Sequence, residues 1–165
     1  GCDVEVFPSN TTAQELLERN PNGIMLSPGP GNPDLLNYTA EMAKELLGRV
    51  PIMGICMGNQ VLGKALGGKT YKLKFGHRGS NHPVKDLLTN RIYITSQNHG
   101  YSIDSDSLPQ EVEVTHISMN DLTVEGLQHK SLPAMSIQYH SEASPGPKDN
   151  EYIFDKFLDM VKESV

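Results

Sequence analysis

The stretch PIMGICMGNQVLG at residues 51–63 constrains the fold more than any other part of the chain. It passes from an apolar run typical of a buried strand, through Gly-x-Cys-x-Gly, into a run with helical spacing. A sharp strand-to-helix turn strains the residue at its apex, and the residues two positions away must be small so that the chain can fold back. Gly54 and Gly58 occupy those positions around Cys56. The stretch therefore predicts a nucleophile elbow that directs the Cys56 side chain at a cleft.

The setting of Cys56 favours a catalytic thiol. The N-terminus of the following helix carries partial positive charge, which favours a thiolate. The turn also leaves the backbone N–H of Met57 free to point at an oxyanion beside the sulfur. The alternative is a small buried hydrophobe, which is what most free cysteines are. The other cysteine, Cys2, has no comparable setting.

The first half of the chain predicts an α/β fold. Apolar runs at residues 2–7, 22–29 and 50–55 are typical of strands, and a segment with helical spacing follows each one. Thr12 and Glu15 form the capping-box pattern that starts the first of these helices. This alternating order predicts a three-layer structure, with a mostly parallel sheet and helices on both faces.

The second half has a different pattern. Short runs separated by turns predict strands at residues 92–98, 111–118, 122–129 and 134–140. Glu151–Val165 has one apolar face at helical spacing, which predicts an amphipathic helix. We expect residues 1–165 to form one domain, because no linker divides them. The chain opens at a strand that corresponds to the second in a doubly wound sheet, so we expect the first strand and helix to be missing.

Charge and hydropathy argue against several functions. The chain has 165 residues and a formal net charge of -6, and its nearest approach to a basic cluster is the short YKLKFGHR, which argues against nucleic-acid binding. No run of about 18 apolar residues occurs, so no membrane span is expected. Two cysteines make no disulfide framework, and the N-terminus lacks the pattern of a signal peptide. We therefore expect a cytoplasmic protein.

His140 is the histidine best placed to serve as a base for Cys56. It stands two residues before Glu142 at the end of an expected strand, where both side chains point to the same side. Glu142 can then accept a hydrogen bond from one imidazole nitrogen while the other nitrogen faces the thiol. The alternative is a surface histidine that happens to lie near a surface glutamate.

These motifs resemble those of the class I (triad) glutamine amidotransferases. Within that family the chain is most similar to the glutaminase part of carbamoyl-phosphate synthetase small subunits. The elbow GICMGNQ, the loop LSPGPGNP and the His-x-Glu pair occur across the triad enzymes. The segments KFGHRGSNHPVKD, QNHGY and EASPGP are more specific, and the resemblance covers essentially the whole chain. It implies the flavodoxin-like α/β fold of this family.

The resemblance also implies a role for each triad residue. Cys56 would attack the side-chain amide carbon of L-glutamine, and His140 would activate the thiol and then protonate the departing ammonia. Glu142 would orient His140. The resulting γ-glutamyl thioester would be hydrolysed to glutamate.

The remaining site residues are also implied by the resemblance. The oxyanion would bind backbone N–H groups of Met57 and of the glycine loop that holds Gly29 and Gly31. The amino-acid end of glutamine would bind Gln60, together with three residues of the QNHGY segment, namely Asn98, Gly100 and Tyr101. The ammonia would pass to a large synthetase subunit that uses ATP and Mg, so no cofactor is expected in this domain.

Two departures from the family pattern leave a second hypothesis open. Asn59 stands where the family usually has histidine, and Ser141 where it usually has proline. A catalytically inactive scaffold or regulatory subunit with the same fold is therefore the alternative to an active glutaminase. A metal site formed by His77, His82 and His99 fits no standard ligand spacing, and we expect none.

Overall fold

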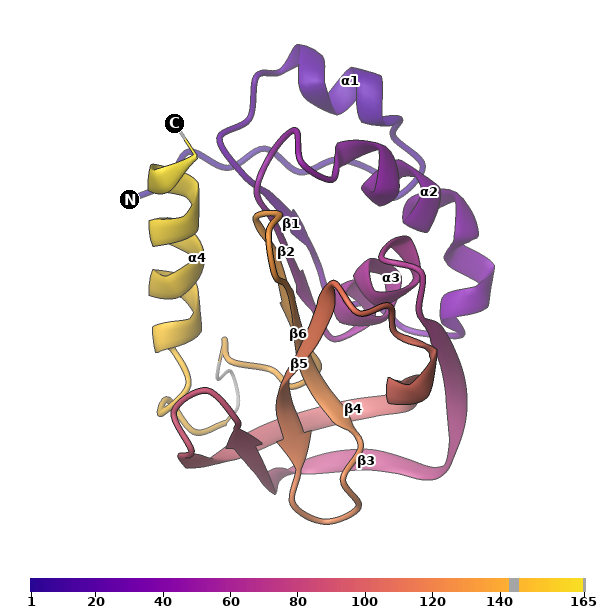
Figure 1. Cartoon of the computed structure of the whole chain (residues 1–165), viewed down its shortest axis with the longest axis vertical. Helices are drawn as coiled ribbons and strands as arrows, with labels where there is room; N and C mark the ends of the chain where they lie inside the picture. Colours follow the sequence, from indigo (N-terminus) through magenta and orange to yellow (C-terminus); the bar gives the residue numbers. More distant parts are fainter. Residues whose placement is uncertain (143–145, 165) are drawn as a thin grey trace.

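The computed structural model describes residues 1–142 and 146–164, which form a seven-stranded sheet flanked by helices (Figure 1). The strands lie in the order β1-β2-β7-β6-β5-β3-β4. They are β1 (Ile24–Leu26), β2 (Ile52–Ile55), β3 (Lys69–Asp86), β4 (Ile92–Asp104), β5 (Val112–Ser118), β6 (Val124–His129) and β7 (Ala134–Ile137). The α-helices are α1 (Ala13–Glu18), α2 (Asn37–Leu46), α3 (Met57–Ala65) and α4 (Tyr152–Glu163), and short 3-10 helices are η1 (Pro33–Leu36) and η2 (Ser105–Ser107).

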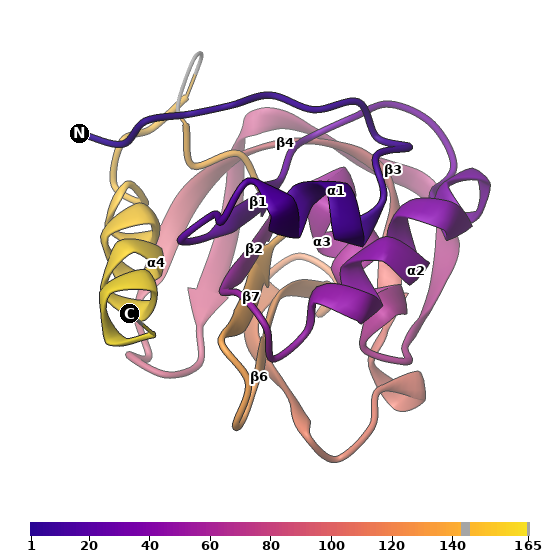
Figure 2. The same cartoon turned by 90° about the horizontal axis from the view of Figure 1, so that it is seen from above.

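The helices cover both faces of the sheet. Helix α4 lies on one face, whereas α1, α2 and α3 lie on the other (Figure 2). Each face has its own cluster of buried side chains, and β2 contributes to both: Ile52 packs in one cluster and its neighbour Met53 in the other. Successive side chains of a strand point to opposite faces, so a central strand that is covered on both sides must be apolar throughout.

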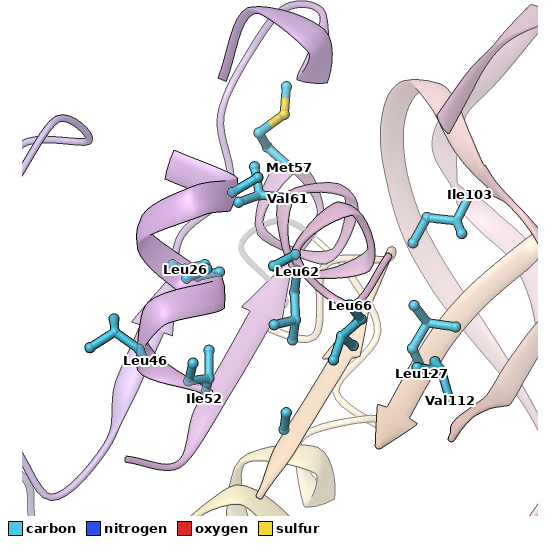
Figure 3. Close-up of a cluster of buried hydrophobic side chains, with 14 of the residues drawn as sticks. Leu26, Leu46, Ile52, Met57, Val61, Leu62, Leu66, Ile103, Val112 and Leu127 are labelled. Carbon is cyan, nitrogen blue, oxygen red and sulfur yellow. The ribbon is translucent and has the colours of Figure 1, made fainter. Parts of the chain in front are cut away.

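The larger cluster packs α3 against the sheet (Figure 3). Val61 and Leu62 of α3 are 2% and 0% exposed, and they lie in the same cluster as Ile52 of β2 and Leu127 of β6. This packing sets the position of α3, whose N-terminus begins directly after Cys56.

The predicted α/β architecture with helices on both faces is confirmed, but the sheet is mixed rather than mostly parallel. Strands β1, β2 and β7 pair in parallel. All the other pairings, β7 with β6, β6 with β5, β5 with β3 and β3 with β4, are antiparallel. Parallel neighbours need long crossovers, whereas three of the antiparallel pairs, β3 with β4, β5 with β6 and β6 with β7, join strands that follow one another directly in the chain.

The prediction of a strand at residues 2–7 is wrong. This segment crosses the molecule without regular secondary structure (Figure 2), and Val4 and Val6 are 74% and 91% exposed. A strand requires ladder hydrogen bonds with a neighbour, which local β-propensity cannot supply. No other strand pairs with the outer side of β1, which therefore lies at the edge of the sheet in the described part of the chain.

The sequence pattern also failed to predict β3. Its 18 residues pair with β4 along most of their length, with irregularities between Lys72 and His77 and between Gly79 and His82. Together β3 and β4 form a long hairpin across one end of the molecule (Figure 1). None of the helices described is long and apolar enough to cross a membrane.

Candidate active site

The parallel part of the sheet brings the predicted catalytic segments together. The loop at residues 28–31 follows β1, Cys56 follows β2, and His140 lies shortly after β7. Parallel neighbours end at the same edge of a sheet, which is where α/β proteins place their ligands. Segments that are distant in sequence therefore meet at the carboxyl ends of three adjacent strands.

Cys56 lies at the apex of the predicted elbow. Its backbone angles are φ 55° and ψ -105°, outside the regions that a residue with a side chain normally occupies. Its backbone N–H donates to Ile137 O of β7 at 2.9 Å, and α3 begins at the next residue. Cys56 is 3% exposed, in contrast to Cys2, which is exposed. A strained residue held by its surroundings at a cleft is typical of a functional site.

The two glycines of the elbow are required by close backbone contacts. A Cβ on Gly54 would lie 2.4 Å from Gly58 O, and a Cβ on Gly58 would lie 2.0 Å from Leu26 O of β1. Both distances are far below a van der Waals contact, and backbone atoms cannot move aside as a flexible side chain can. The Gly-x-Cys-x-Gly pattern therefore has the steric cause that the sequence suggested.

His140 is held by Glu142 and by β4. Its Nδ1 lies 2.6 Å from Glu142 Oε1, and its backbone N–H donates to Ser96 O at 2.9 Å. The hydrogen bond with the Cys56 thiol and then the one with Glu142 raise the pKa of His140 to about 10. Burial raises the pKa of Glu142, but the hydrogen bond with His140 outweighs this effect and lowers it below its usual value. Cys56 and His140 line the same cleft, and the Cys56 thiol also lies 4.0 Å from Asn98 O, so the thiol, the imidazole and its carboxylate partner meet at one site.

A cleft of about 670 Å³ opens beside Cys56 and His140. Its wall includes all seven of the predicted substrate and oxyanion residues: Gly29, Gly31, Met57, Gln60, Asn98, Gly100 and Tyr101. Met57 is the first residue of α3, where a backbone N–H has no partner within the helix. The cleft therefore combines a thiol, a base and free backbone donors, which are the groups required for acyl transfer.

Comparisons with known proteins identify the family. The sequence profile described as "Glutamine amidotransferase class-I" matches residues 1–160. The chain belongs to this family. Among solved structures, a GMP synthase component from Thermoplasma acidophilum has a TM-score of 0.84 and 23% identity, and the match covers 99% of this chain and 83% of that one. At 23% identity this similarity shows a shared fold and nothing more about function.

Curated relatives are much more similar in sequence. The carbamoyl phosphate synthase small chain of Staphylococcus haemolyticus is 57% identical over 99% of this chain and 45% of its own length. The pyrimidine-specific small chain from Bacillus subtilis is 56% identical over 98% of this chain and 44% of its own. The amidotransferase chain thus spans just under half the length of these relatives.

Gln60 reaches the cleft from the first turn of α3. Its Nε2 donates to Tyr101 O at 2.9 Å and to Gln138 Oε1 at 3.0 Å. These two bonds use both amide hydrogens, so the other amide atom, Oε1, must turn the opposite way. In the described part of the chain no group donates a hydrogen bond to that oxygen, and Gln60 lines the cleft.

Six residues on the wall of the cleft were not predicted as site residues, and three of them, Pro28, Pro30 and Asn32, belong to the loop that holds Gly29 and Gly31. Lys72, Arg78 and His99 line the cleft from β3 and β4, and His99 Nδ1 lies 2.8 Å from Tyr101 O. Neither Lys72 nor Arg78 forms an ion pair with an acidic residue that the structure describes. The signal was the short basic run YKLKFGHR, whose position beside the cleft depends on the pairing of β3 with β4.

The two departures from the family pattern fall on buried positions. Asn59 is 0% exposed, donates to Gln138 Oε1 at 3.1 Å and accepts from Ser136 Oγ at 2.8 Å. Ser141 is also 0% exposed, and its Oγ has no hydrogen-bond partner among the described residues. Neither substitution displaces Cys56 or His140 from the arrangement above. Part of the family-specific segment EASPGP, residues 143–145, lies outside the described residues.

A second cluster of titratable groups shares His99 with the wall of the cleft. The ligand-type atoms of His77, His99 and Glu125 all lie within 4.8 Å of one another, whereas His82, the third histidine in the metal hypothesis, is not in this group. His77 contacts Glu125 at 3.2 Å and Asp121 at 2.8 Å, and the bond with Glu125 raises the pKa of His77 to about 9. Both nitrogens of His77 are thus engaged by carboxylates. Burial raises the pKa of Glu125 and lowers that of His99 to about 4, so not every contact in the cluster is an ion pair.

Proposed function

We propose that this chain is the glutaminase module of a carbamoyl-phosphate synthase small chain, which hydrolyses L-glutamine and supplies ammonia to a large, ATP-dependent synthetase subunit. The observation that carries the proposal is the cleft that Cys56 and His140 line together, with Glu142 Oε1 2.6 Å from Nδ1 of His140. The names of relatives with 57% and 56% identity support the choice within the family.

In the first half of the reaction the sulfur of Cys56 attacks the side-chain amide carbon of glutamine. A protonated His140, favoured by its pKa of about 10, stabilises the thiolate before attack. The tetrahedral oxyanion accepts hydrogen bonds from the backbone N–H of Met57 and from the loop of Gly29 and Gly31, each worth roughly 3–4 kcal/mol. His140 then gives its proton to the departing nitrogen, the C–N bond breaks, and ammonia and a γ-glutamyl thioester result.

In the second half water replaces the sulfur. The neutral His140 takes a proton from water, the new C–O bond forms, and the C–S bond breaks. Glutamate leaves, and Cys56 returns to a thiolate beside a protonated His140. Glu142 keeps Nδ1 engaged throughout, so Nε2 remains the nitrogen that exchanges protons with the substrate.

The charges on the wall of the cleft suit a zwitterionic amino acid. The free Oε1 of Gln60 is an acceptor for the α-ammonium group. The cationic side chains of Lys72 and Arg78 supply positive charge for the α-carboxylate. Asn98, Gly100 and the Tyr101 backbone complete the same side of the cleft.

The partner would carry the rest of the synthesis. In this proposal ATP and Mg are used on the large subunit, and the glutaminase module itself needs no cofactor. The name of the Bacillus subtilis relative, which specifies pyrimidine synthesis, makes that pathway the first to test.

The decisive experiment replaces Cys56 in the complete small chain assembled with its large subunit. Cys56→Ser should lower glutamine-dependent synthesis by at least about 10,000-fold, because the nucleophile is lost. Synthesis from added ammonia should continue at the rate of the unsubstituted complex. If a correctly assembled variant lost both activities, the glutaminase assignment would be wrong.

Labelling tests the alternative of an inactive scaffold. A chloroketone that mimics glutamine should modify the unsubstituted protein once, at Cys56, since the cleft would position its reactive carbon against the sulfur. A protein that bound the large subunit but resisted the reagent would favour the scaffold.

A further inference from the structure

A chain of buried amides connects the substrate side of the cleft to the strand that delivers His140. It runs from Tyr101 O through Gln60 to Gln138, and from Gln138 through Asn59 to Ser136. The links measure 2.9, 3.0, 3.1 and 2.8 Å. The four side chains come from α3 and from the segment around β7, and each is at most 2% exposed.

One backbone carbonyl sets the direction of every amide in this chain. Tyr101 O can only accept, so the group of Gln60 that faces it must be Nε2. The same Nε2 faces Gln138, which must present Oε1, and Asn59 must then present Nδ2 to that oxygen. If any one side-chain amide were rotated by 180°, its oxygen and nitrogen would change places, and a donor would then face a donor or an acceptor would face an acceptor. The free Oε1 of Gln60 is therefore directed at the cleft by the whole chain.

Gln138 is the branch point of this chain. Its Oε1 accepts from Asn59 and Gln60 together, and its backbone N–H donates to Glu125 O of β6 at 2.8 Å. Its backbone is thus fixed by the sheet, two residues before His140. Gln138 does not line the cleft, so its influence on a bound molecule passes through Gln60.

The Gln138 side chain lowers the stability of the folded protein more than an apolar side chain of the same size would. Its Nε2 is buried and has no hydrogen-bond partner among the residues that the structure describes. An unpaired buried donor destabilises a folded protein, and an apolar side chain of similar shape would avoid that cost. A role that needs the acceptor oxygen explains why an amide stands here.

We propose that Gln138 is a positioning residue for substrate recognition, which holds the Gln60 amide with its oxygen toward the α-ammonium group of glutamine. The inference rests on the proposed function, because it names how that site selects an amino acid. If the inference is correct, loss of the Gln138 amide should impair recognition of the amino-acid end of glutamine, while the Cys56 thiol keeps its reactivity.

Two alkylating reagents separate these effects on Cys56 in the complete small chain. A glutamine-mimicking chloroketone uses the amino-acid end of the site, whereas iodoacetamide has no such end. Gln138→Met removes the acceptor and keeps a similar shape. It should slow the chloroketone by about tenfold, the equivalent of one hydrogen bond, and leave the rate with iodoacetamide unchanged.

A conservative variant and a distant control complete the set. Gln138→Glu keeps an acceptor oxygen toward Gln60 and should retain more of the chloroketone rate than Gln138→Met. Asn150→Leu removes another buried amide, whose Nδ2 donates to Ile94 O at 3.2 Å, and should leave the ratio of the two rates unchanged.

A double-mutant cycle distinguishes positioning from general damage. If Gln138 acts through Gln60, the variant with both Gln60→Ala and Gln138→Met should react with the chloroketone no more slowly than Gln60→Ala alone. Independent, multiplying effects, or equal slowing of both reagents by Gln138→Met, would overturn the inference. An unsubstituted protein that reacted with iodoacetamide but not with the chloroketone would overturn the proposed function, and the inference with it.

Discussion

Cys56 has an unfavourable backbone conformation at the wall of the cleft. A non-glycine residue at φ 55° and ψ -105° persists only where its surroundings over-determine it. Here Gly54 and Gly58 permit backbone contacts that no side chain would allow, and Ile137 O holds the Cys56 N–H. The same turn that strains Cys56 brings its sulfur to the cleft.

Gly58→Ala should destroy this turn. The added Cβ would lie 2.0 Å from Leu26 O, so β1 and the start of α3 must separate. We expect a loss of about 3 kcal/mol in the free energy of unfolding, measured by urea denaturation. Gly29→Ala is the matched control, because its Cβ would meet only the Met57 side chain at 3.6 Å. Equal stability of the two variants would contradict the steric account of the elbow.

Glu142→Gln should release part of the charge on His140. Since the carboxylate favours the protonated imidazole, an amide in its place should lower the pKa of His140 from about 10. NMR titration of the imidazole protons measures this change directly. An unchanged His140 pKa in Glu142→Gln would contradict this role of the carboxylate.

Helix α4 is fastened to the sheet by a polar contact as well as by its apolar face. Tyr152 at its start donates to Asp86 Oδ2 of β3 at 3.1 Å and lies 3.3 Å from His116 Nε2 of β5. Ile153 and Phe157 lie on the buried face of this helix and are 1% and 7% exposed. A hydroxyl paired with a buried carboxylate is among the stronger neutral-to-charged hydrogen bonds.

Tyr152→Phe tests this attachment. It leaves the buried Asp86 carboxylate without one donor and should lower the free energy of unfolding by about 2 kcal/mol. Tyr38→Phe is the control, because the Tyr38 hydroxyl contacts Ser9 at an exposed site and should matter by less than about 0.5 kcal/mol. Urea midpoints that shift equally would show that the Tyr152 hydroxyl contributes little.

Elements differ in how far local sequence predicts them. The capping box at Thr12 and Glu15 formed as expected, because each partner lies within one helical turn of the other. Strand β3 was missed because its residues carry charges, glycines and a proline, and many of its side chains are exposed. Its pairing with β4 and β5 depends on residues distant in sequence.

Histidines in different parts of the molecule have pKa values that are shifted in opposite directions. Burial lowers the pKa of His116 to about 4, since both of its nitrogens face hydroxyl groups and a charge there would be poorly solvated. The hydrogen bond with Glu125 raises the pKa of His77 to about 9, and the bonds with Cys56 and Glu142 raise that of His140 to about 10. These shifts make global stability depend on pH on both sides of neutrality.

The free energy of unfolding should be greatest near pH 6.5, the ordinary histidine pKa. As pH falls from about 6.5 to about 4, the unfolded chain binds protons that folded His99 and His116 reject, so stability falls. As pH rises from about 6.5 toward 9 and 10, folded His77 and His140 keep protons that the unfolded chain releases, so stability falls again. Urea midpoints between pH 4 and 10 measure both effects.

Substitutions can show which histidine causes the loss of stability on each side of this pH profile. His116→Gln should reduce the loss on the acid side but not abolish it, because burial also lowers the pKa of His99 to about 4. Glu125→Gln should reduce the alkaline loss by removing the larger cause of the raised pKa of His77. A stability that increased steadily from pH 6.5 to 9 would contradict the assignment of His77 as a proton-retaining group.

The elbow at Cys56 and the pairing of His140 with Glu142 could be predicted from short stretches of residues. The geometry of a tight turn, or of two side chains on one face of a strand, depends on neighbours along the chain. The α/β alternation is likewise a local pattern repeated. Family resemblance added seven further residues, all of which line the same cleft as Cys56.

Other features followed from contacts between distant segments. Residues 2–7 have a strand-like pattern but no neighbour to pair with, while β3 has a poor pattern but two neighbours. Lys72 and Arg78 reach the cleft, and Gln138 meets Asn59 and Gln60, because separate strands and a helix bring them together. Ladder pairing and buried hydrogen bonds join groups through space, so the order of residues along the chain carries little information about them.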